Sequence, residues 1–593
     1  MAETLISPGV LARENDQSFI GGQPVTYGAA IIGPAVKGPV GIPVAISSFS
    51  QYQALFGGAV ESGSQFYTYL NSVAISNYFS QGGESLLITR VVTGSFTSAV
   101  TSGSTAAANN SGIITVGFEN NGGGLDPDLG YQKTSFQLKT ISQGAIMNNY
   151  QAADSAGGTL NSGSADNLRW EISSVNTSSG QFSLLLRRGN DTTNQKSVLE
   201  TYNNLSMDPT AANYVASAIG DTYATVASDN GEYFVQTNGT YPNRSAYIYV
   251  SEVNTPTPNY FDNDGSPKDL YTGSLPAVGS GSFTSAVGNN FENGDAKFNQ
   301  NITAGNIQGI GPNDYTQSIA LLNNQDQYQF NVISAPGLIF SLHPSQVSSL
   351  VSLAQNRTDC VSVIDLVTYG STISGVVNNA SGFDTSYSAT YWPWLQTIDP
   401  LTAQTVWVPP STYIPGVYAF TDASSDPWFA PAGLIRGSLG SVIRAERQLT
   451  SGNRDTLYEA NINPIATFPG SGIVVFGQKT LQKKASALDR VNVRRLLIAL
   501  KSYISQVSNN LVFEQNTIAT RNNFLSQVNP YLTSVQQRQG LYAFKVVMDE
   551  SNNTPDVVDR NQLVCQIYLQ PTKTAEFIIL DFNVLPTGAT FPE

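Results

Sequence analysis

The sequence has very few of the residues on which catalysis and metal binding most often depend. Its 593 residues include one histidine, His343, and two cysteines, Cys360 and Cys565. These residues cannot form a Cys/His zinc site, and a Ser-His-Asp or Cys-His catalytic site would have to use the single imidazole. Both cysteines lie in apolar, strand-like stretches, so we expect them to be buried thiols.

Long apolar runs are also missing. The longest, such as EFIILDF, are far shorter than the roughly 20 residues that a membrane-crossing helix requires. The first residues, MAETLISPGV, lack a basic segment followed by an apolar one, so the sequence predicts no signal peptide. We therefore expect the chain to be made and kept in a cytoplasm-like compartment unless other machinery moves it.

Motifs that bind nucleotides or metals are absent as well. The turns of the one clear β-α-β pattern have neither G-x-G-x-x-G nor P-loop spacing. The acidic stretches MDESNNTPDVVDR and DNDGSPKD lack the ligand spacing of a calcium loop. The sequence therefore predicts no cofactor and no metal site.

Charged residues are scarce and unevenly distributed. They make up 12% of the chain, against about 25% in a typical globular domain. Residues 430–545 hold 14 Lys and Arg and only 5 Asp and Glu, although the whole chain has a formal net charge of -14. Such segregation is more informative than the net value, because it marks one region as the basic part of an acidic protein.

Residues 489–507 are predicted to form a helix in this basic region. Its apolar stripe consists of Val493, Leu496, Leu497, Leu500, Tyr503, Ile504 and Val507. Arg490, Arg494 and Lys501 fall within about 40° of one another beside the stripe. This basic ridge could bind phosphate groups, an acidic protein surface or only solvent. No aromatic stacking residues or RNA-binding signature surround it, which disfavours nucleic acid.

The apolar patterns predict a multi-domain α/β (α+β) fold. Continuous apolar strands such as YGAAIIG and SLLITRVV precede a Gly/Ser/Asn-rich region with short strands. After it, QFNVISAPG, a helix through Val347 and Ala354, and CVSVIDLV predict a parallel β-α-β unit. In the last third we expect the strands GIVVFG, LVFE, LYAFKVVM and QLVCQIYL, and a helix from Ile518 to Val535.

These elements divide the chain into five parts. We predict an N-terminal extended arm (1–20), a middle α/β domain (21–95 and 311–425), a β-rich inserted surface domain (96–310), an inner C-terminal α/β domain (426–570) and a C-terminal strand arm (571–593). The heptapeptide GSFTSAV occurs at 94–100 and again at 281–287. We expect the two copies to be neighbouring strands where the insertion leaves and rejoins the middle domain.

Several stretches resemble the contractile tail sheath protein family. They include YSATYWPWLQTIDPLTAQTVWVPPSTYIPGVYAFTD, DPWFAPAGLIRG, LYEANINPI, GSGIVVFGQKTL and DRVNVRRL, followed by GLYAFKVVMDESNNTP. They occur in the order and spacing of that family, and the sequence is most similar to the sheaths of large contractile-tailed bacteriophages. The resemblance covers about residues 1–95 and 330–593.

The resemblance implies a structural role and no enzymatic activity. Sheath proteins stack as six-membered rings around a tail tube in a metastable extended state, and they contract to drive the tube through the host cell envelope. The fold it implies is a two-layer α/β sheath core with a β-rich inserted outer domain and extended arms. It further implies a subunit of the virion tail that is assembled in the cytoplasm of the host bacterium.

The resemblance also implies partners and contact residues. Expected partners are other sheath subunits, the tail tube protein, and the baseplate and tail terminator proteins, with no direct nucleic acid contact and no membrane insertion. Arg490, Arg494 and Lys501 would face the tube. The arm residues that would pair with neighbouring subunits are Leu5, Ile6, Val10, Phe19, Phe577, Ile578, Ile579, Leu580, Phe582 and Val584.

Two alternatives stay open at the level of the sequence. One is the sheath of a non-phage contractile injection system, which shares the same core. The other is a β-rich glycan-binding or glycan-cleaving protein of the tailspike type, since Trp392, Trp394, Trp407 and Trp428 could line a carbohydrate groove. Their proline-rich surroundings are equally typical of packed loops.

Overall fold

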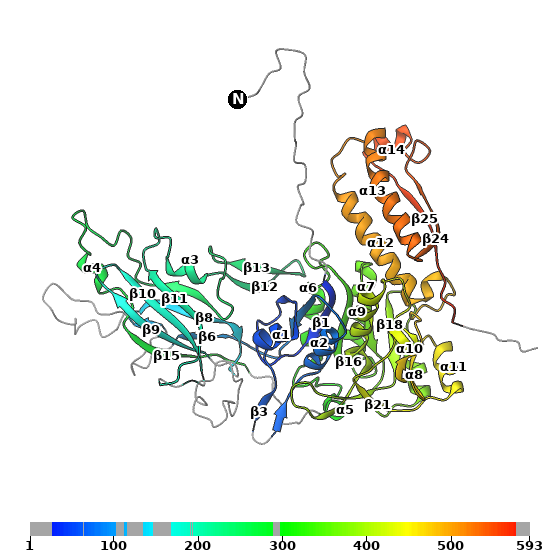
Figure 1. Cartoon of the computed structure of the whole chain (residues 1–593), viewed down its shortest axis with the longest axis horizontal. Helices are drawn as coiled ribbons and strands as arrows, with labels where there is room; N and C mark the ends of the chain where they lie inside the picture. The colour runs from blue at the N-terminus through cyan, green and yellow to red at the C-terminus, as the bar shows by residue number, and fades with distance from the viewer. Residues whose placement is uncertain are drawn as a thin grey trace, which may run out of the picture.

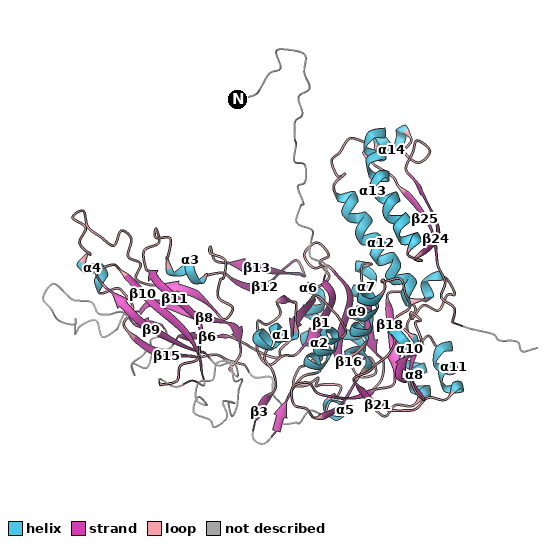
Figure 2. Cartoon of the chain, viewed as in Figure 1, coloured by secondary structure: helices cyan, strands magenta, loops and turns pink. Residues whose placement is uncertain are grey.

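The protein was analysed as a computed structural model that describes residues 27–62, 65–101, 112–114, 134–145, 168–189, 191, 194–288 and 297–576. These residues form an elongated molecule with a β-rich part on the left, a central α/β part and a helical part at the upper right (Figure 1). The left part consists mainly of strands, and long helices dominate the upper right part (Figure 2).

The central part is built on an eight-stranded sheet. Its strands, in spatial order, are β2 (Pro43–Ile46), β5 (Leu86–Arg90), β1 (Tyr27–Gly33), β16 (Phe330–Ile339), β17 (Val361–Asp365), β18 (Ser388–Trp392), β22 (Asn463–Phe468) and β23 (Gly472–Val475). The six strands from β5 to β22 run parallel, and β2 and β23 are antiparallel edges. The predicted strands YGAAIIG and SLLITRVV and the predicted parallel pair β16–β17 are confirmed.

Both faces of this sheet are buried. Along β1, Ala29 and Ile31 enter one hydrophobic cluster, whereas Ala30 and Ile32 enter a second cluster on the opposite face. A strand that is buried on both faces must be apolar at every position, which explains the continuous apolar runs. The α/β class is therefore confirmed, but this core has three layers in place of the expected two.

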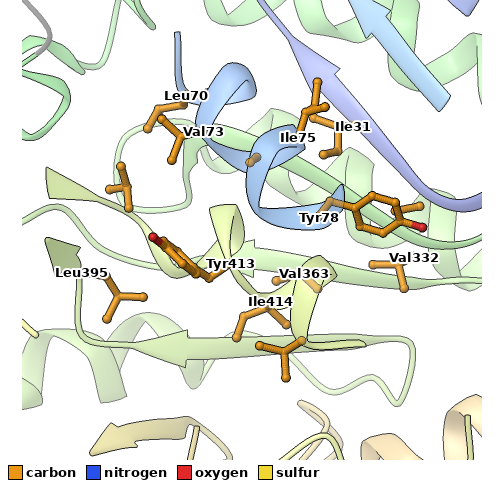
Figure 3. Packing of buried hydrophobic residues seen from close by; sticks show 14 of the residues in the cluster. Ile31, Leu70, Val73, Ile75, Tyr78, Val332, Val363, Leu395, Tyr413 and Ile414 are labelled. Atoms are coloured by element: carbon orange, nitrogen blue, oxygen red, sulfur yellow. The ribbon is translucent and has the colours of Figure 1, made fainter. Parts of the chain in front are cut away.

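Helices cover the two faces. The first cluster contains residues of α1 (Phe49–Phe56), α2 (Leu70–Ser80) and α9 (Ile414–Ser424), and Figure 3 shows side chains of α2 and α9 packed over Val332 and Val363 of the sheet. The second cluster contains residues of α6 (Tyr315–Leu321), α7 (Pro344–Arg357) and α8 (Ile373–Ala380). Pro344 at the first position of α7 fixes the start of that helix.

Smaller elements surround the core. A three-stranded sheet consists of β20 (Thr405–Val408), β19 (Leu395–Ile398) and β21 (Val442–Ala445). The remaining elements here are β3 (Val60–Ser62), β4 (Gln65–Tyr67), α5 (Phe298–Asn301), η2 (Pro312–Asp314), η3 (Pro410–Thr412), α10 (Gly433–Arg436), α11 (Ser451–Glu459) and η4 (Ala487–Asp489).

The inserted part is an antiparallel β structure with its own core. Its main strands are β11 (Val198–Ser206), β10 (Gln181–Arg188), β9 (Leu168–Asn176), β15 (Gly279–Thr284), β6 (Ser98–Thr101), β8 (Thr134–Gln143) and β14 (Ile248–Val253), in that order, and β7 (Ile113–Ile114) pairs with β8. Two short helices, α3 (Val215–Ile219) and α4 (Asp269–Thr272), complete it. A separate cluster of buried residues, including Trp170, Phe182 and Leu184, fills its interior.

The two copies of GSFTSAV lie side by side at the root of the insertion. In β6 and β15, Val100 and Thr101 pair with Thr284 and Phe283, and the N–H of Thr97 donates to the carbonyl oxygen of Val287 at 3.0 Å. The expectation that these copies are the exit and return strands of the insertion is confirmed.

A hairpin provides a second connection between the inserted part and the core. Its strands, β12 (Tyr223–Asp229) and β13 (Glu232–Asn238), form a two-stranded sheet that extends toward the core in Figure 1. Val226, Tyr233 and Val235 pack against the second hydrophobic cluster of the core. The insertion is therefore held at its covalent root and also along this hairpin.

The helical part contains α12 (Val491–Asn509), α13 (Ile518–Gln537), β24 (Leu541–Val547), α14 (Pro555–Asp559) and β25 (Gln566–Pro571), with a fourth hydrophobic cluster between them. The predicted strand LVFE is wrong, because Leu511–Glu514 form the turn that connects α12 to α13. Within 426–570, which the sequence assigned to one domain, β22 and β23 belong to the central sheet because β22 pairs in parallel with β18.

Candidate functional site

The basic ridge predicted on α12 was the main candidate site. Arg490 lies at the position preceding the helix, Arg494 lies in its first turn and Lys501 lies in its second half. Arg494 is buried, the Arg490 side chain is 23% exposed, and Lys501 is exposed. The expected exposed ridge of three cations is therefore wrong for two of its members.

Arg494 and Arg495 bind aromatic side chains of the core. The Arg494 guanidinium carbon lies 4.0 Å from the ring centroid of Tyr387, and the guanidinium also donates to the hydroxyl of Ser386. The Arg495 guanidinium lies 4.7 Å from the ring centroid of Tyr418 and donates to the Asp422 carboxylate. Burial lowers the pKa of Arg494. These stacking contacts fasten the first turns of α12 to the core.

Arg490 has an internal partner of a different kind. Its Nε and Nη2 atoms donate to the two carboxylate oxygens of Glu576 at 2.8 and 2.9 Å, and its Nη1 lies 3.1 Å from the Asp489 carboxylate. Burial lowers the pKa of Arg490, but the hydrogen bond and the charge of Glu576 outweigh it, and the pKa is raised. Arg490 is thus engaged within its own subunit, at the point where the described chain ends.

A third stacked arginine lies just after α13 and contacts Trp428, which packs in the hydrophobic cluster of the helical part. The Arg538 guanidinium lies 5.1 Å from the Trp428 ring and pairs with the carboxylate of Asp426. The Trp428 indole N–H donates in return to the carbonyl oxygen of Arg538 at 3.0 Å. Arg494 and Arg495 therefore contact aromatic side chains of the core, and Arg538 contacts one of the helical part.

A helical wheel could not have revealed these partners. It compares residues within one helix, whereas Tyr387, Tyr418 and Trp428 come from segments about 70 to 110 positions earlier. Glu576, the partner of Arg490, and the two other side chains that donate to it, Tyr458 and Gln478, were missed for the same reason. The available signal was indirect: aromatic residues recur in the predicted core segments that precede this basic helix.

The predicted arm residues Leu5, Ile6, Val10 and Phe19 lie outside the described residues, as do those of the C-terminal arm. The latter are Phe577, Ile578, Ile579, Leu580, Phe582 and Val584. Their strand pairing with neighbours stays a prediction.

The tryptophans are packed side chains. Trp392, Trp394 and Trp428 are buried, and Trp407 packs against the first hydrophobic cluster. The Trp394 indole N–H donates to the carbonyl oxygen of Val367 at 3.0 Å. These residues therefore do not line a carbohydrate groove, and the feature that motivated the glycan-binding alternative is lost.

The remaining titratable candidates are structural. His343 is buried at the start of α7, with Nε2 at 2.9 Å from the carbonyl oxygen of Thr303, and burial lowers its pKa. Cys360 is buried and Cys565 is half-buried; burial raises the pKa of both thiols. Across the described ranges, no three His, Cys, Asp or Glu side chains are placed to hold a metal ion.

No helix within the described parts of the chain combines the length and hydropathy needed to cross a membrane.

Comparisons with known proteins identify two domains of one family. The model of the phage tail sheath protein central domain matches residues 308–481, and that of the phage tail sheath C-terminal domain matches residues 483–585. The boundary between the two matches falls just before α12. The first match therefore contains most of the central sheet, and the second contains the helical part.

Named relatives agree with these matches. The tail sheath protein of Vibrio phage KVP40 is 31% identical over 401 residues, which cover 63% of this chain and 56% of the relative. The tail sheath protein of Enterobacteria phage T4 is 40% identical over 187 residues, covering 32% of this chain and 28% of the relative. The chain thus aligns with at most about half the length of these relatives.

Solved structures of sheath proteins are also similar. A crystal structure of a sheath tail protein from Listeria innocua is 10% identical, with a TM-score of 0.49, and the match covers 93% of this chain and 96% of that chain. The contracted helical sheath of the anti-feeding prophage is 24% identical, with a TM-score of 0.39, and covers 48% and 80%. The two domain matches and the named relatives identify residues 308–585 as a central and a C-terminal domain of the phage tail sheath family.

Proposed function

We propose that this protein is the structural subunit of a contractile tail sheath. It polymerises as stacked hexameric rings around a tail tube in a metastable extended state. On a signal, the rings contract and drive the tube through the host cell envelope for genome delivery. The single observation that carries this proposal is the pair of sheath domain matches, which together span residues 308–585.

The proposed role requires protein contacts and no catalysis. The free energy for contraction would come from the difference between the extended and the contracted packing of the same subunits.

The terminal arms are proposed to link neighbouring subunits by adding strands to their sheets. The acceptor that we favour is the sheet of β24 and β25. Among the described strands these two pair only with each other, and Phe544 and Ile567 pack the sheet onto the helical part. Each outer edge then offers backbone donors and acceptors to an incoming strand.

Contact with the tube is proposed to involve the basic residues of α12. Of Arg490, Arg494 and Lys501, only Lys501 is exposed, so it is the member that could form an ion pair with an acidic tube surface. Exposed ion pairs contribute about 0 to 1 kcal/mol each, which suits a contact that is repeated many times and must be released.

The proposed partners are other copies of the subunit, the tail tube protein, and the baseplate and tail terminator proteins. The proposed location is the virion tail, with assembly in the host bacterial cytoplasm. Both named relatives are phage proteins, which favours a phage sheath over the sheath of a non-phage injection system.

Negative-stain microscopy of the purified protein tests this function. Hollow, striated cylinders are expected at micromolar concentration, with a larger inner diameter when no tube is present to hold the extended state. Persistent monomers or compact trimers at all protein concentrations, with or without added tubes, would contradict a sheath.

A further inference from the structure

The carboxylate of Glu576 is the most heavily bonded side chain near the C-terminal end of the described chain. It accepts two hydrogen bonds from Arg490, one from the Tyr458 hydroxyl at 2.7 Å and one from Gln478 Nε2 at 3.0 Å. Gln478 Nε2 also donates to the Thr574 hydroxyl at 2.7 Å. We call Arg490, Tyr458, Gln478 and Glu576 the clamp.

The three donors of the clamp are anchored in different elements. Tyr458 lies on α11, Gln478 follows β23, and Arg490 precedes α12. The backbone holds the last two together, because the N–H of Val491 donates to the carbonyl oxygen of Gln478 at 2.8 Å and Lys479 forms a β-bridge with Arg490. The three donors therefore hold Glu576 from segments that are bonded to one another and that adjoin β23, the edge strand of the central sheet.

The geometry of the Arg490–Glu576 contact stabilises the clamp and fixes its orientation. Arg490 and Glu576 form a two-point guanidinium–carboxylate contact, which fixes orientation as well as distance. Their side chains are only 23% and 18% exposed, so solvent screens the pair weakly. Burial raises the pKa of Glu576, but the hydrogen bonds from Arg490, Tyr458 and Gln478 outweigh it and hold this pKa below its ordinary value.

The segment leading to Glu576 depends on the clamp for its position. After β25 ends at Pro571, residues 572–576 belong to no strand or helix. Thr574, Ala575 and Glu576 form one wall of a cavity of about 380 Å³ whose other walls include Arg454 and Phe476. A segment beside a cavity has little packing to hold it, so its side-chain hydrogen bonds determine its path.

We propose that the clamp is the anchor of the C-terminal arm: it fixes the place and direction in which residues 577–593 leave the subunit, and it transfers tension on that arm to the central sheet and α12. This inference rests on the proposed function, in which the arm links one subunit to its neighbour. Arg490 is then a positioning residue of the linkage between subunits, in place of a contact to the tube.

Limited proteolysis of the isolated subunit tests the anchor without any assembly. Lys573 is exposed, and trypsin must pull residues 574–576 away from the body to cleave after it. We expect cleavage at Lys573 to be about tenfold faster in Glu576→Gln and in Arg490→Gln, which corresponds to about 1.4 kcal/mol of opening free energy. The double variant should be cleaved no faster than either single one, since both remove the same interaction.

A matched control removes an ion pair of the same type that lies outside the clamp. Asp556 on α14 pairs with Arg560, which directly follows that helix, and both side chains are largely exposed. Asp556→Asn should leave cleavage at Lys573 unchanged. The same set of variants is then mixed with tubes, and the amount of pelleted sheath cylinders is measured. The two clamp variants should form several-fold fewer or shorter cylinders than the wild type and Asp556→Asn.

The two readouts separate the anchor from the proposed function. Unchanged cleavage in both clamp variants would overturn the anchor. Faster cleavage with a normal yield of cylinders would overturn its role in linking subunits. If the wild type formed no cylinders while cleavage still followed the clamp, the sheath function would fail and the anchor would stand.

Discussion

Buried charges without an opposite charge recur among the residues of the core. Arg90 is fully buried and donates to the carbonyl oxygens of Ala35, Val36, Gly38 and Gln143, and burial lowers its pKa to about 10. Asp365 is equally buried and accepts from the backbone N–H and the hydroxyl of Ser411. Each charge is stabilised by hydrogen bonds to neutral groups. Burying it lowers the folding stability relative to a solvated charge, but its hydrogen bonds fix the local backbone.

Asp365 should make the stability of the protein depend on pH. Burial raises its pKa from an ordinary value of 3.8 to about 7, so between these values the folded state binds one proton more than the unfolded state. Stability must then fall as the pH rises from about 4 to 7. Asp365→Asn, which has the shape of the protonated group, should stabilise the protein by roughly 4 kcal/mol at pH 8 and hardly at all at pH 4.

Urea unfolding at several pH values measures this difference. Asp384→Asn, which alters an exposed carboxylate, is measured in parallel as the control. A constant offset between Asp365→Asn and the wild type from pH 4 to 8 would contradict a raised pKa.

The two cations Arg494 and Lys501 should behave in opposite ways. Arg494→Ala removes a buried side chain stacked on Tyr387, so we expect a loss of about 1 to 3 kcal/mol in the free energy of unfolding. Lys501→Ala should change it by less than about 0.5 kcal/mol. Binding of assembled sheath to tubes at low salt should instead respond to Lys501→Glu. Equal stability losses for the two alanine variants would contradict the burial of Arg494.

At the scale of elements, local sequence patterns predicted those helices and strands whose position depends mainly on their own residues. The strands of β1 and β5 are continuous apolar runs because both of their faces are buried, and α12 begins and ends within two residues of the predicted bounds 489–507. LVFE failed because strand propensity alone does not provide a partner strand. Phe513 lies there fully exposed in a turn, with a positive φ of 71°.

The site could be predicted only in part for the same physical reason. The periodicity of α12 located its apolar stripe, but the identity of the surface beside the stripe depends on segments that pack against it. Arg494 is buried because Tyr387 and Ser386 cover it, and Arg490 is paired because Glu576 returns to it from 86 positions away. No pattern within one helix contains that information.

The β12–β13 hairpin should be an energetic link between the insertion and the core. Val235 packs on the core cluster, whereas its neighbour Phe234 points to the other face and is 40% exposed. Val235→Asp would place a carboxylate in an apolar contact and should lower the unfolding free energy by about 1 to 3 kcal/mol. Phe234→Asp should have an effect below about 0.5 kcal/mol.

Urea unfolding of both hairpin variants, followed by tryptophan fluorescence, measures these losses. The interior of the insertion contains Trp170, and the core contains Trp392 and Trp394. Equal unfolding free energies for Val235→Asp and Phe234→Asp would show that the hairpin does not help to attach the insertion to the core.

At the scale of the whole molecule, the three parts have separate hydrophobic cores and differ in how they are joined. The insertion is joined to the core by paired strands and a hairpin. The helical part is joined by the stacked arginines, by the clamp and by apolar contacts, since Val491 of α12 belongs to the first core cluster. Forces applied to the C-terminal arm would reach the core through these contacts.

Truncation of the arm separates the stability of the subunit from the linkage between subunits. A chain that ends at Glu576 keeps every described contact, including the four hydrogen bonds of the clamp, so its thermal unfolding should match that of the full chain. It should nevertheless form no cylinders, because the apolar residues 577–585 that would pair with a neighbour are gone. A chain that ends at Pro571 also loses the clamp and should unfold at a lower temperature. Scanning calorimetry and electron microscopy of both truncated chains provide the two measurements, and cylinders formed by the chain ending at Glu576 would show that subunits are linked by some other surface.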